Sequence, residues 1–187
     1  VDFKRIQALN PDLIIGNKEE NSEEDIEALA KEFPVWMSDI VGVKDALDMM
    51  HQLGEILGLS KHANDLMQRI EQGFQELNSK TLTPPIRVAY AIWKDPWMFA
   101  GKNTFIDEML QLAGFINVIE EVRYPQLQPN EILKLKPNLL LLSSEPFPFK
   151  GKHLEGMNTL FPSLPFVLVD GEMFSWYGSK MAEFPDY

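Results

Sequence analysis

The chain contains no cysteine, and this absence excludes several kinds of site at once. Disulfides, cysteine-based zinc sites, iron–sulfur clusters and thiol nucleophiles all require cysteine. Histidine is also scarce: His51, His62 and His153 are the only three, and their spacing matches no metal-ligand motif. No Ser/His/Asp arrangement or nucleophile-elbow motif occurs either. We therefore expect no protein-held metal, no intrinsic cofactor and no catalytic residues.

Positive charge and long hydrophobic runs are lacking as well. Lys and Arg number 17 against 28 Asp and Glu, which gives a net charge of −11. Such a balance argues against a nucleic-acid partner, because neutralising phosphates needs a surplus of Lys and Arg. It suits either a basic docking partner or a simply solvated surface. No apolar run approaches the roughly 20 residues that cross a bilayer.

What the chain does contain is a pattern that occurs twice, at residues 6–15 and 132–141. Each copy predicts the end of a helix, a proline-containing turn and a short apolar strand buried on both faces. Each is followed by a second strand that begins with proline and ends with aspartate, at 34–39 and 165–170. A repeated unit of this kind predicts two similar lobes with a cleft between them.

The repeat also predicts that the first lobe is incomplete. The second copy is preceded by its own strand and helix, at about 86–114, whereas the first copy has nothing before it. Residue 1 is valine, and no signal peptide is present. We expect any targeting signal to lie in the missing part.

Helices and strands alternate along the chain, which predicts an α/β fold with two Rossmann-like lobes and parallel sheets. The expected parts are 1–42 (remainder of the N-terminal lobe), 43–80 (helical connector) and 81–187 (C-terminal lobe). Ser22 and Ser60 are expected helix caps, and the helix from 61 to 79 would be about 30 Å long. A stiff connector of this length predicts little closure of the lobes. The remaining expected helices are 23–32, 43–57, 103–113, 129–135 and 151–159, and the expected strands are 34–38, 86–92, 116–119, 138–142 and 166–169.

The loops that follow three of these strands are unusually aromatic. In parallel α/β sheets, ligands gather beyond the carboxyl ends of the strands. The aromatic residues fit a wide apolar site for a large, rigid ligand, or else small hydrophobic cores that cover the strand ends. Nearby basic residues either meet anionic groups of the ligand or are solvated. The aromatic candidates are Trp93, Trp97, Phe99, Trp176 and Tyr177, and the basic ones are Lys94, Lys102, Arg123, Lys150 and Lys152.

The order of these segments resembles the helical-backbone substrate-binding proteins of ABC importers, which serve cobalamin, haem and ferric siderophores. The resemblance rests on the two Pro-Asp/Asn strands, the long helix, the Arg-Val strand and the aromatic loop that ends in Gly101 and Lys102. It implies a periplasmic or envelope-anchored monomer that is not an enzyme. It also implies a metal chelate as transported ligand and a transmembrane permease as partner.

The resemblance also assigns individual residues. Trp97, Met98 and Phe99 fall where an aromatic ligand contact is expected, and Tyr124 falls where cobalamin-binding members carry a stacking tryptophan. Asn17 stands where those members carry another tryptophan. This departure argues against cobalamin as the ligand and leaves haem, a siderophore or another metal chelate open.

Docking to the permease is assigned in the same way to one acidic residue on each lobe. Glu23 and Glu131 match those positions, and both also stand at expected helix starts, where a carboxylate is favourable in any case. The alternatives are an enzyme or a sensor subunit on the same two-lobed scaffold.

Overall fold

The structure, a computed structural model, describes residues 1–78 and 84–187. It has the predicted α/β fold class, and its strands form two sheets that are largely parallel. The chain divides into two compact units, Val1–Ile40 and Val41–Tyr187. The finer division at 42/43 and 80/81 stays a prediction, and the second of these boundaries lies outside the described residues.

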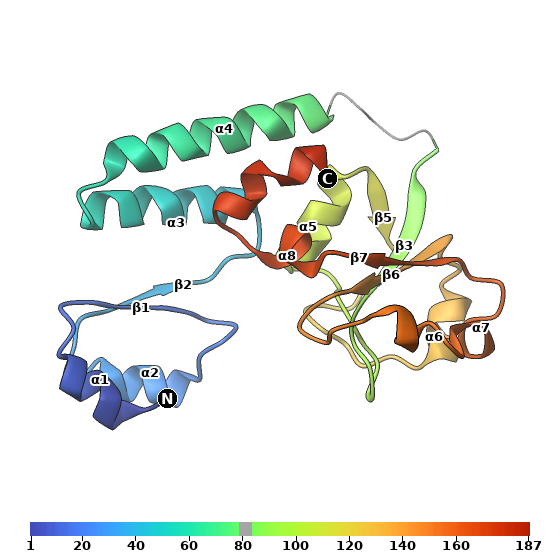
Figure 1. The fold of residues 1–187 in the computed structure, drawn as a ribbon, viewed down its shortest axis with the longest axis horizontal. Coiled ribbons are helices and arrows are strands. Elements are labelled where there is room, and N and C mark those ends of the chain that lie inside the picture. The colour runs from blue at the N-terminus through green and yellow to red at the C-terminus, as the bar shows by residue number, and fades with distance from the viewer. Residues whose placement is uncertain (79–83) are drawn as a thin grey trace. The chain divides into compact units, whose positions relative to one another are not determined.

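The first unit alternates helix and strand: α1 (Phe3–Leu9), β1 (Ile14–Asn17), α2 (Glu23–Leu29) and β2 (Val35–Ser38). The two strands pair in parallel, with Ile14 opposite Val35 (Figure 1). Ser22 caps α2 as predicted, because its Oγ accepts the backbone N–H of Asp25 at 3.3 Å. The prediction that β1 is buried on both faces is wrong here: Ile15 is 49% exposed, since this sheet has only two strands.

The second unit opens with two helices, α3 (Val43–Ile56) and α4 (Ser60–Asn78), which pack side by side (Figure 1). Gly58, at φ +68°, permits the turn between them. Gly54 allows the close approach, since a Cβ there would lie 2.6 Å from the Cβ of Ala63. The prediction that Ser60 caps this helix is wrong by one position, because Ser60 is already the first residue of α4. The expected helix end at Ser79 lies outside the described residues.

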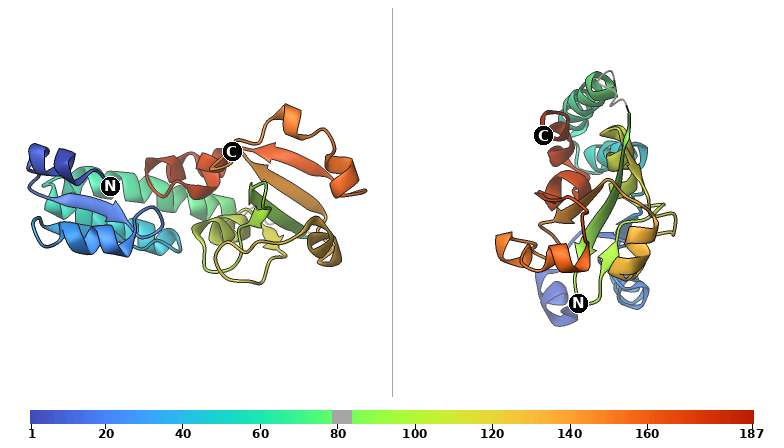
Figure 2. Two further views of the ribbon diagram at one scale, coloured as in Figure 1. Left: turned by 90° about the horizontal axis from the view of Figure 1, so that it is seen from below. Right: turned by 90° about the vertical axis from the view of Figure 1, so that its right-hand side faces the viewer.

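A five-stranded sheet forms the centre of this unit. Its path is β4 (Met98–Phe99), β3 (Ile86–Trp93), β6 (Leu139–Ser143) and β7 (Phe166–Val169), and β5 (Phe115–Asn117) also pairs with β3. All are parallel to β3 or β6 except β4, which is antiparallel. Figure 2 gives two further views of these green and orange strands. The prediction of an unbroken loop over 93–102 is wrong, because β4 forms within it.

The other helices of this unit are α5 (Phe105–Leu112), α6 (Pro129–Lys134), α7 (Met157–Leu160) and α8 (Gly171–Ser175). Thr104 caps α5, as its Oγ1 accepts the backbone N–H of Asp107 at 3.1 Å. The helix expected over 151–159 is instead a 3₁₀ turn, Gly151–His153, followed by α7. Gly156 separates them with φ +80°, which an α-helix cannot contain. Two more 3₁₀ turns, Ser179–Ala182 and Phe184–Asp186, end the described chain.

Candidate functional site

Three loops extend from the carboxyl ends of the parallel strands β3, β6 and β7. Parallel pairing brings these ends to one edge of the sheet, where Trp93, Ser143 and Asp170 stand. We call this the carboxyl edge. Two tryptophans on it are exposed to solvent: Trp93 keeps 37% of its surface and Trp176 keeps 53%. Large exposed apolar rings grouped at one edge of a sheet are typical of a binding surface.

Hydrogen bonds join the loops after β6 and β7 to each other. The backbone N–H of Gly171 donates to Oγ of Ser144 at 2.9 Å, and Oγ of Ser175 donates to Oε1 of Glu145 at 2.9 Å. A side chain at Gly171 would collide, because its Cβ would lie 2.4 Å from Oγ of Ser143. The loop after β6 therefore fixes α8, which directly precedes Trp176.

A buried tyrosine supports this junction from below. Tyr90 on β3 has no exposed surface and donates its hydroxyl hydrogen to Oγ of Ser143 at 3.1 Å. Burial raises the pKa of Tyr90 well above its usual range, so the hydroxyl remains a donor at any physiological pH. Oγ of Ser143 in turn donates to the backbone oxygen of Glu145 at 2.6 Å.

Two predicted ligand contacts, Trp97 and Phe99, lie in the core. Trp97 is 6% exposed and Phe99 is fully buried. The indole of Trp97 stacks on Phe149 at 5.8 Å between centroids and meets Phe161 edge-on at 5.2 Å. This burial agrees with the alternative expected from the sequence, a hydrophobic core that covers the strand ends. Direct contact of Trp97 and Phe99 with a ligand stays a prediction.

Met98 and Tyr124 are half-buried and belong to neighbouring segments. The backbone N–H of Phe99 donates to the oxygen of Pro125 at 3.1 Å, and that of Gly101 donates to the oxygen of Arg123 at 2.8 Å. These bonds bring 122–126 alongside 98–102. Met98 and Tyr124 therefore lie on neighbouring chain segments, as a shared contact surface would require.

Tyr177 and Asn17 both have structural contacts. The ring of Tyr177, half-buried, meets Phe105 edge-on at 5.6 Å. Asn17 lies at the end of β1 in the first unit, and its Oδ1 accepts the backbone N–H of Glu20 at 2.7 Å. It is the last residue of that strand, and its side-chain amide orders the turn that follows.

The two predicted docking residues, Glu23 and Glu131, are exposed and stand in the first turns of α2 and α6. Glu131 also caps the N-terminus of α6, because its Oε2 accepts the backbone N–H of Gln128 at 2.7 Å. The carboxylates are placed where the helix dipole stabilises them.

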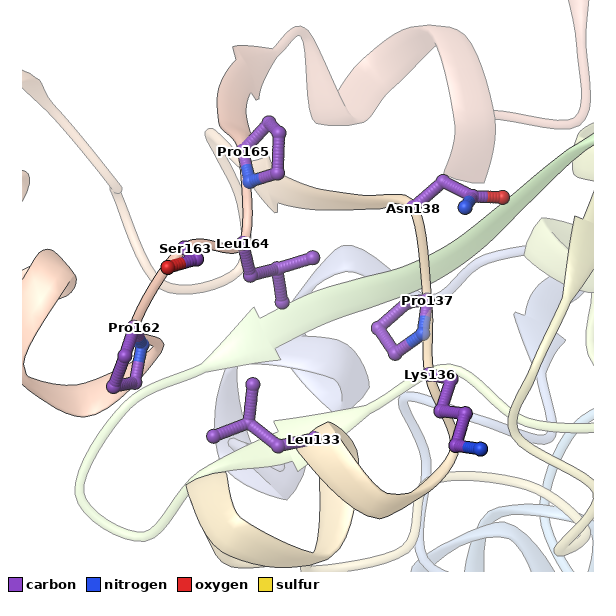
Figure 3. A pocket seen from close by; sticks show the side chains of 8 residues that line it. All are labelled: Leu133, Lys136, Pro137, Asn138, Pro162, Ser163, Leu164 and Pro165. Atoms are coloured by element: carbon purple, nitrogen blue, oxygen red, sulfur yellow. The ribbon is translucent and has the colours of Figure 1, made fainter.

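A pocket of about 290 Å³ lies at the opposite edge of the sheet (Figure 3). Its walls are the turns that precede β6 and β7, which carry the prolines of the repeated pattern. Parallel strands place this pocket away from the carboxyl edge, so it is separate from the candidate site. Its lining residues are Leu133, Lys136, Pro137, Asn138, Pro162, Ser163, Leu164 and Pro165.

Within residues 1–78 and 84–187, no group of three or more His, Asp or Glu side chains is placed to hold a metal ion. No helix in the same ranges combines the length and apolar character that crossing a membrane requires. The carboxyl edge offers apolar surface and hydrogen-bond donors and acceptors, which suits binding a ligand.

In parallel α/β folds, small molecules commonly bind beyond the carboxyl ends of the strands, where the exposed aromatic residues of this chain stand. The chain belongs to the periplasmic binding protein family, whose sequence pattern matches residues 1–159. It is a binding protein and not an enzyme, in agreement with the sequence analysis. The resemblance to cobalamin- and haem-type binding proteins is likewise confirmed by its relatives.

One such relative is the vitamin B12-binding protein of Pectobacterium atrosepticum, which is 24% identical over 193 residues, or 97% of this chain and 67% of the relative. Among solved structures, the periplasmic vitamin B12-binding protein BtuF of Vibrio cholerae matches with a TM-score of 0.80 at 19% identity. That match covers 100% of this chain and 75% of BtuF. The periplasmic heme-binding protein BhuT, in complex with two hemes, matches with a TM-score of 0.82 at 18% identity, over 97% of this chain and 75% of BhuT.

Proposed function

We propose that this chain is part of the substrate-binding component of an ABC importer, and that it captures a metal chelate and delivers it to the permease. The ligand is cobalamin, haem or a ferric siderophore, and the protein works as a monomer in the periplasm or anchored at the cell envelope. Family membership and the relatives named for vitamin B12 and haem support this role.

One observation of the structure carries the proposal: Trp93 and Trp176 are exposed on a carboxyl edge that hydrogen bonds hold in place. Rings of this size bury large flat ligands by area and stacking. Met98, Tyr124 and Tyr177 extend the proposed contact surface of the second unit. Asn17, in the first unit, is a separate proposed ligand contact. Trp97 and Phe99 act beneath it as support.

The ligand is tested by isothermal titration of the protein with cobalamin, haem and a ferric siderophore, with tryptophan fluorescence as a second readout. We expect one of them to bind and to quench the emission. A variant that carries Trp93→Ala and Trp176→Ala should lose at least tenfold in affinity, since each lost aromatic contact costs about 1–3 kcal/mol. Leu57→Ala, which removes an exposed apolar side chain (57%) from the α3–α4 turn, is the control. Failure of all three ligands to bind would remove the metal-chelate assignment.

Docking is tested separately by reversing both charges, Glu23→Lys and Glu131→Lys. We expect transport to be abolished while ligand binding persists, because the exposed carboxylates would meet basic residues of the permease. Asp65→Lys with Glu71→Lys changes the same number of exposed charges on α4, away from both helices, and serves as control. Normal transport by the first double variant would end the docking proposal, and a binding defect would point to a different role for these residues.

A further inference from the structure

Three lysines stand together beside the exposed aromatic residues of a strongly acidic chain. They follow β3 and β6 on the carboxyl edge, and we call them the lysine cluster: Lys94, Lys150 and Lys152. Lys150 and Lys152 are exposed and Lys94 is half-buried. In the described part of the chain, ion pairs involve other lysines, such as Lys18 and Lys180, and none includes the cluster.

A histidine connects the lysine cluster to the aromatic surface. The ring of His153 packs on Phe147 at 5.2 Å between centroids, and Phe147 meets Trp93 edge-on at 5.6 Å. Nδ1 of His153 accepts the backbone N–H of Lys150 at 2.9 Å. A continuous series of contacts therefore runs from an exposed indole to the lysines.

The positive charges of the lysine cluster all act on the imidazole of His153. Contact with the rings lowers the pKa of His153 by desolvation, and the positive charges of Lys152, Lys94 and Lys150 lower it further. These effects favour the neutral form of the imidazole, and the positive charge around it is supplied by the lysines. Ammonium groups that repel one another gain from a shared anion.

We infer that the ligand carries an anionic group, a carboxylate or a phosphate, which the lysine cluster binds while the apolar body of the ligand covers Trp93. This inference rests on the proposed function and specifies its ligand class. With a net charge of −11, the rest of the chain disfavours an anion, so the cluster also orients the ligand. A neutral or cationic chelate would gain no affinity from the three charges.

Haem and haem dimethyl ester test the inference, because they share one ring system and only haem has free carboxylates. The wild-type protein should bind haem more tightly than the ester, and added salt should weaken haem binding. A variant with Lys94→Gln, Lys150→Gln and Lys152→Gln should lose about tenfold in affinity for haem, as expected for a few exposed ion pairs. It should bind the ester unchanged. A control with Lys4→Gln, Lys61→Gln and Lys134→Gln alters the net charge equally on other exposed sites.

The possible failures separate the two proposals. Equal binding of haem and ester, or binding of cobalamin alone with no effect of the lysine variant, would overturn the inference and leave the proposed function standing. Where no chelate binds, inorganic pyrophosphate is added and the amide NMR signals of the three lysines are followed. Shifts that disappear in the variant would support an anion site for phosphate, whereas unchanged signals would overturn it.

Discussion

The start of α3 depends on a carboxylate from another helix, and this predicts an unusual pH dependence. Oε2 of Glu108 on α5 accepts the backbone N–H of Val43 at 3.1 Å. Oδ2 of Asp45 accepts the two preceding N–H groups, of Val41 and Gly42, at 3.0 Å each. A Cβ at Gly42 would lie 1.8 Å from Oε2 of Glu108, so only glycine permits this contact.

Glu108 gains a hydrogen bond at this position, but its charge is poorly solvated. Burial raises the pKa of its carboxyl above the ordinary value of 4.5, and the nearby Asp45 and Asp107 raise it further, while the bond from Val43 lowers it. The folded state therefore holds the proton more tightly than the unfolded state does. This group's contribution to stability is fully present below pH 4.5, falls as pH rises toward the higher folded pKa, and is constant above it.

The test compares Glu108→Gln with Glu108→Ala. Glutamine keeps an acceptor for Val43 without the charge, so we expect stability at pH 7 equal to or above that of the wild type, and a flatter pH profile above 4.5. Alanine leaves the N–H without an acceptor and should cost about 1–2 kcal/mol. Urea unfolding at several pH values, followed by tryptophan fluorescence, measures both, since Trp93, Trp97 and Trp176 all lie in the second unit. Glu71→Gln removes an exposed charge as control.

Two outcomes would refute this reasoning. If Glu108→Gln destabilises as much as Glu108→Ala, the charge itself is required and the desolvation argument fails. If Glu108→Gln keeps the wild-type pH profile between 4.5 and 7, the titration of Glu108 does not contribute to stability.

Two further substitutions test the packing of the loops. Trp97→Ala should lower the free energy of unfolding in urea by about 3–5 kcal/mol, because the ring is buried among three phenylalanines. The same change at the exposed Trp176 should lower it by well under 1 kcal/mol. Similar losses of stability at both positions would contradict this difference in burial. Gly101→Ala should lower the melting temperature, with a cost of about 1–3 kcal/mol, because its Cβ would lie 2.0 Å from the backbone oxygen of Glu121. Gly151→Ala, where a Cβ meets nothing within 4 Å, is the neutral comparison, and an equal effect of both would refute the steric argument.

The sequence predicts the regular elements well because their signals are local. Proline and aspartate delimit β7 at its observed bounds, and Ser22 caps its helix through a hydrogen bond that spans three residues. The short strand β4 has no such signal. Two residues pair with β3 there, and the turn before them contains Asp95 at φ +60°.

The roles of the aromatic residues could not be predicted in the same way. Trp93, the last residue of β3, and Trp97, in the loop that follows, stand four positions apart, yet only Trp93 remains exposed. The difference comes from Phe149 and Phe161, which are more than 50 residues away and cover only Trp97. A pattern of aromatic loop residues therefore indicates a site, but distant packing decides which rings can meet a ligand.

That packing also has an energetic consequence for binding. Ser143 accepts the hydroxyl of Tyr90 and donates to the backbone of Glu145, and the carboxylate of Glu145 accepts the hydroxyl of Ser175, one residue before Trp176. A ligand that meets loops already fixed by such a series avoids much of the entropy cost of ordering them, which is about 0.5–1.5 kcal/mol for each immobilised flexible side chain. Within the second unit, affinity should therefore depend on the area and charge that the carboxyl edge presents. Weakening the series, as by Tyr90→Phe, should reduce affinity without removing a single ligand contact.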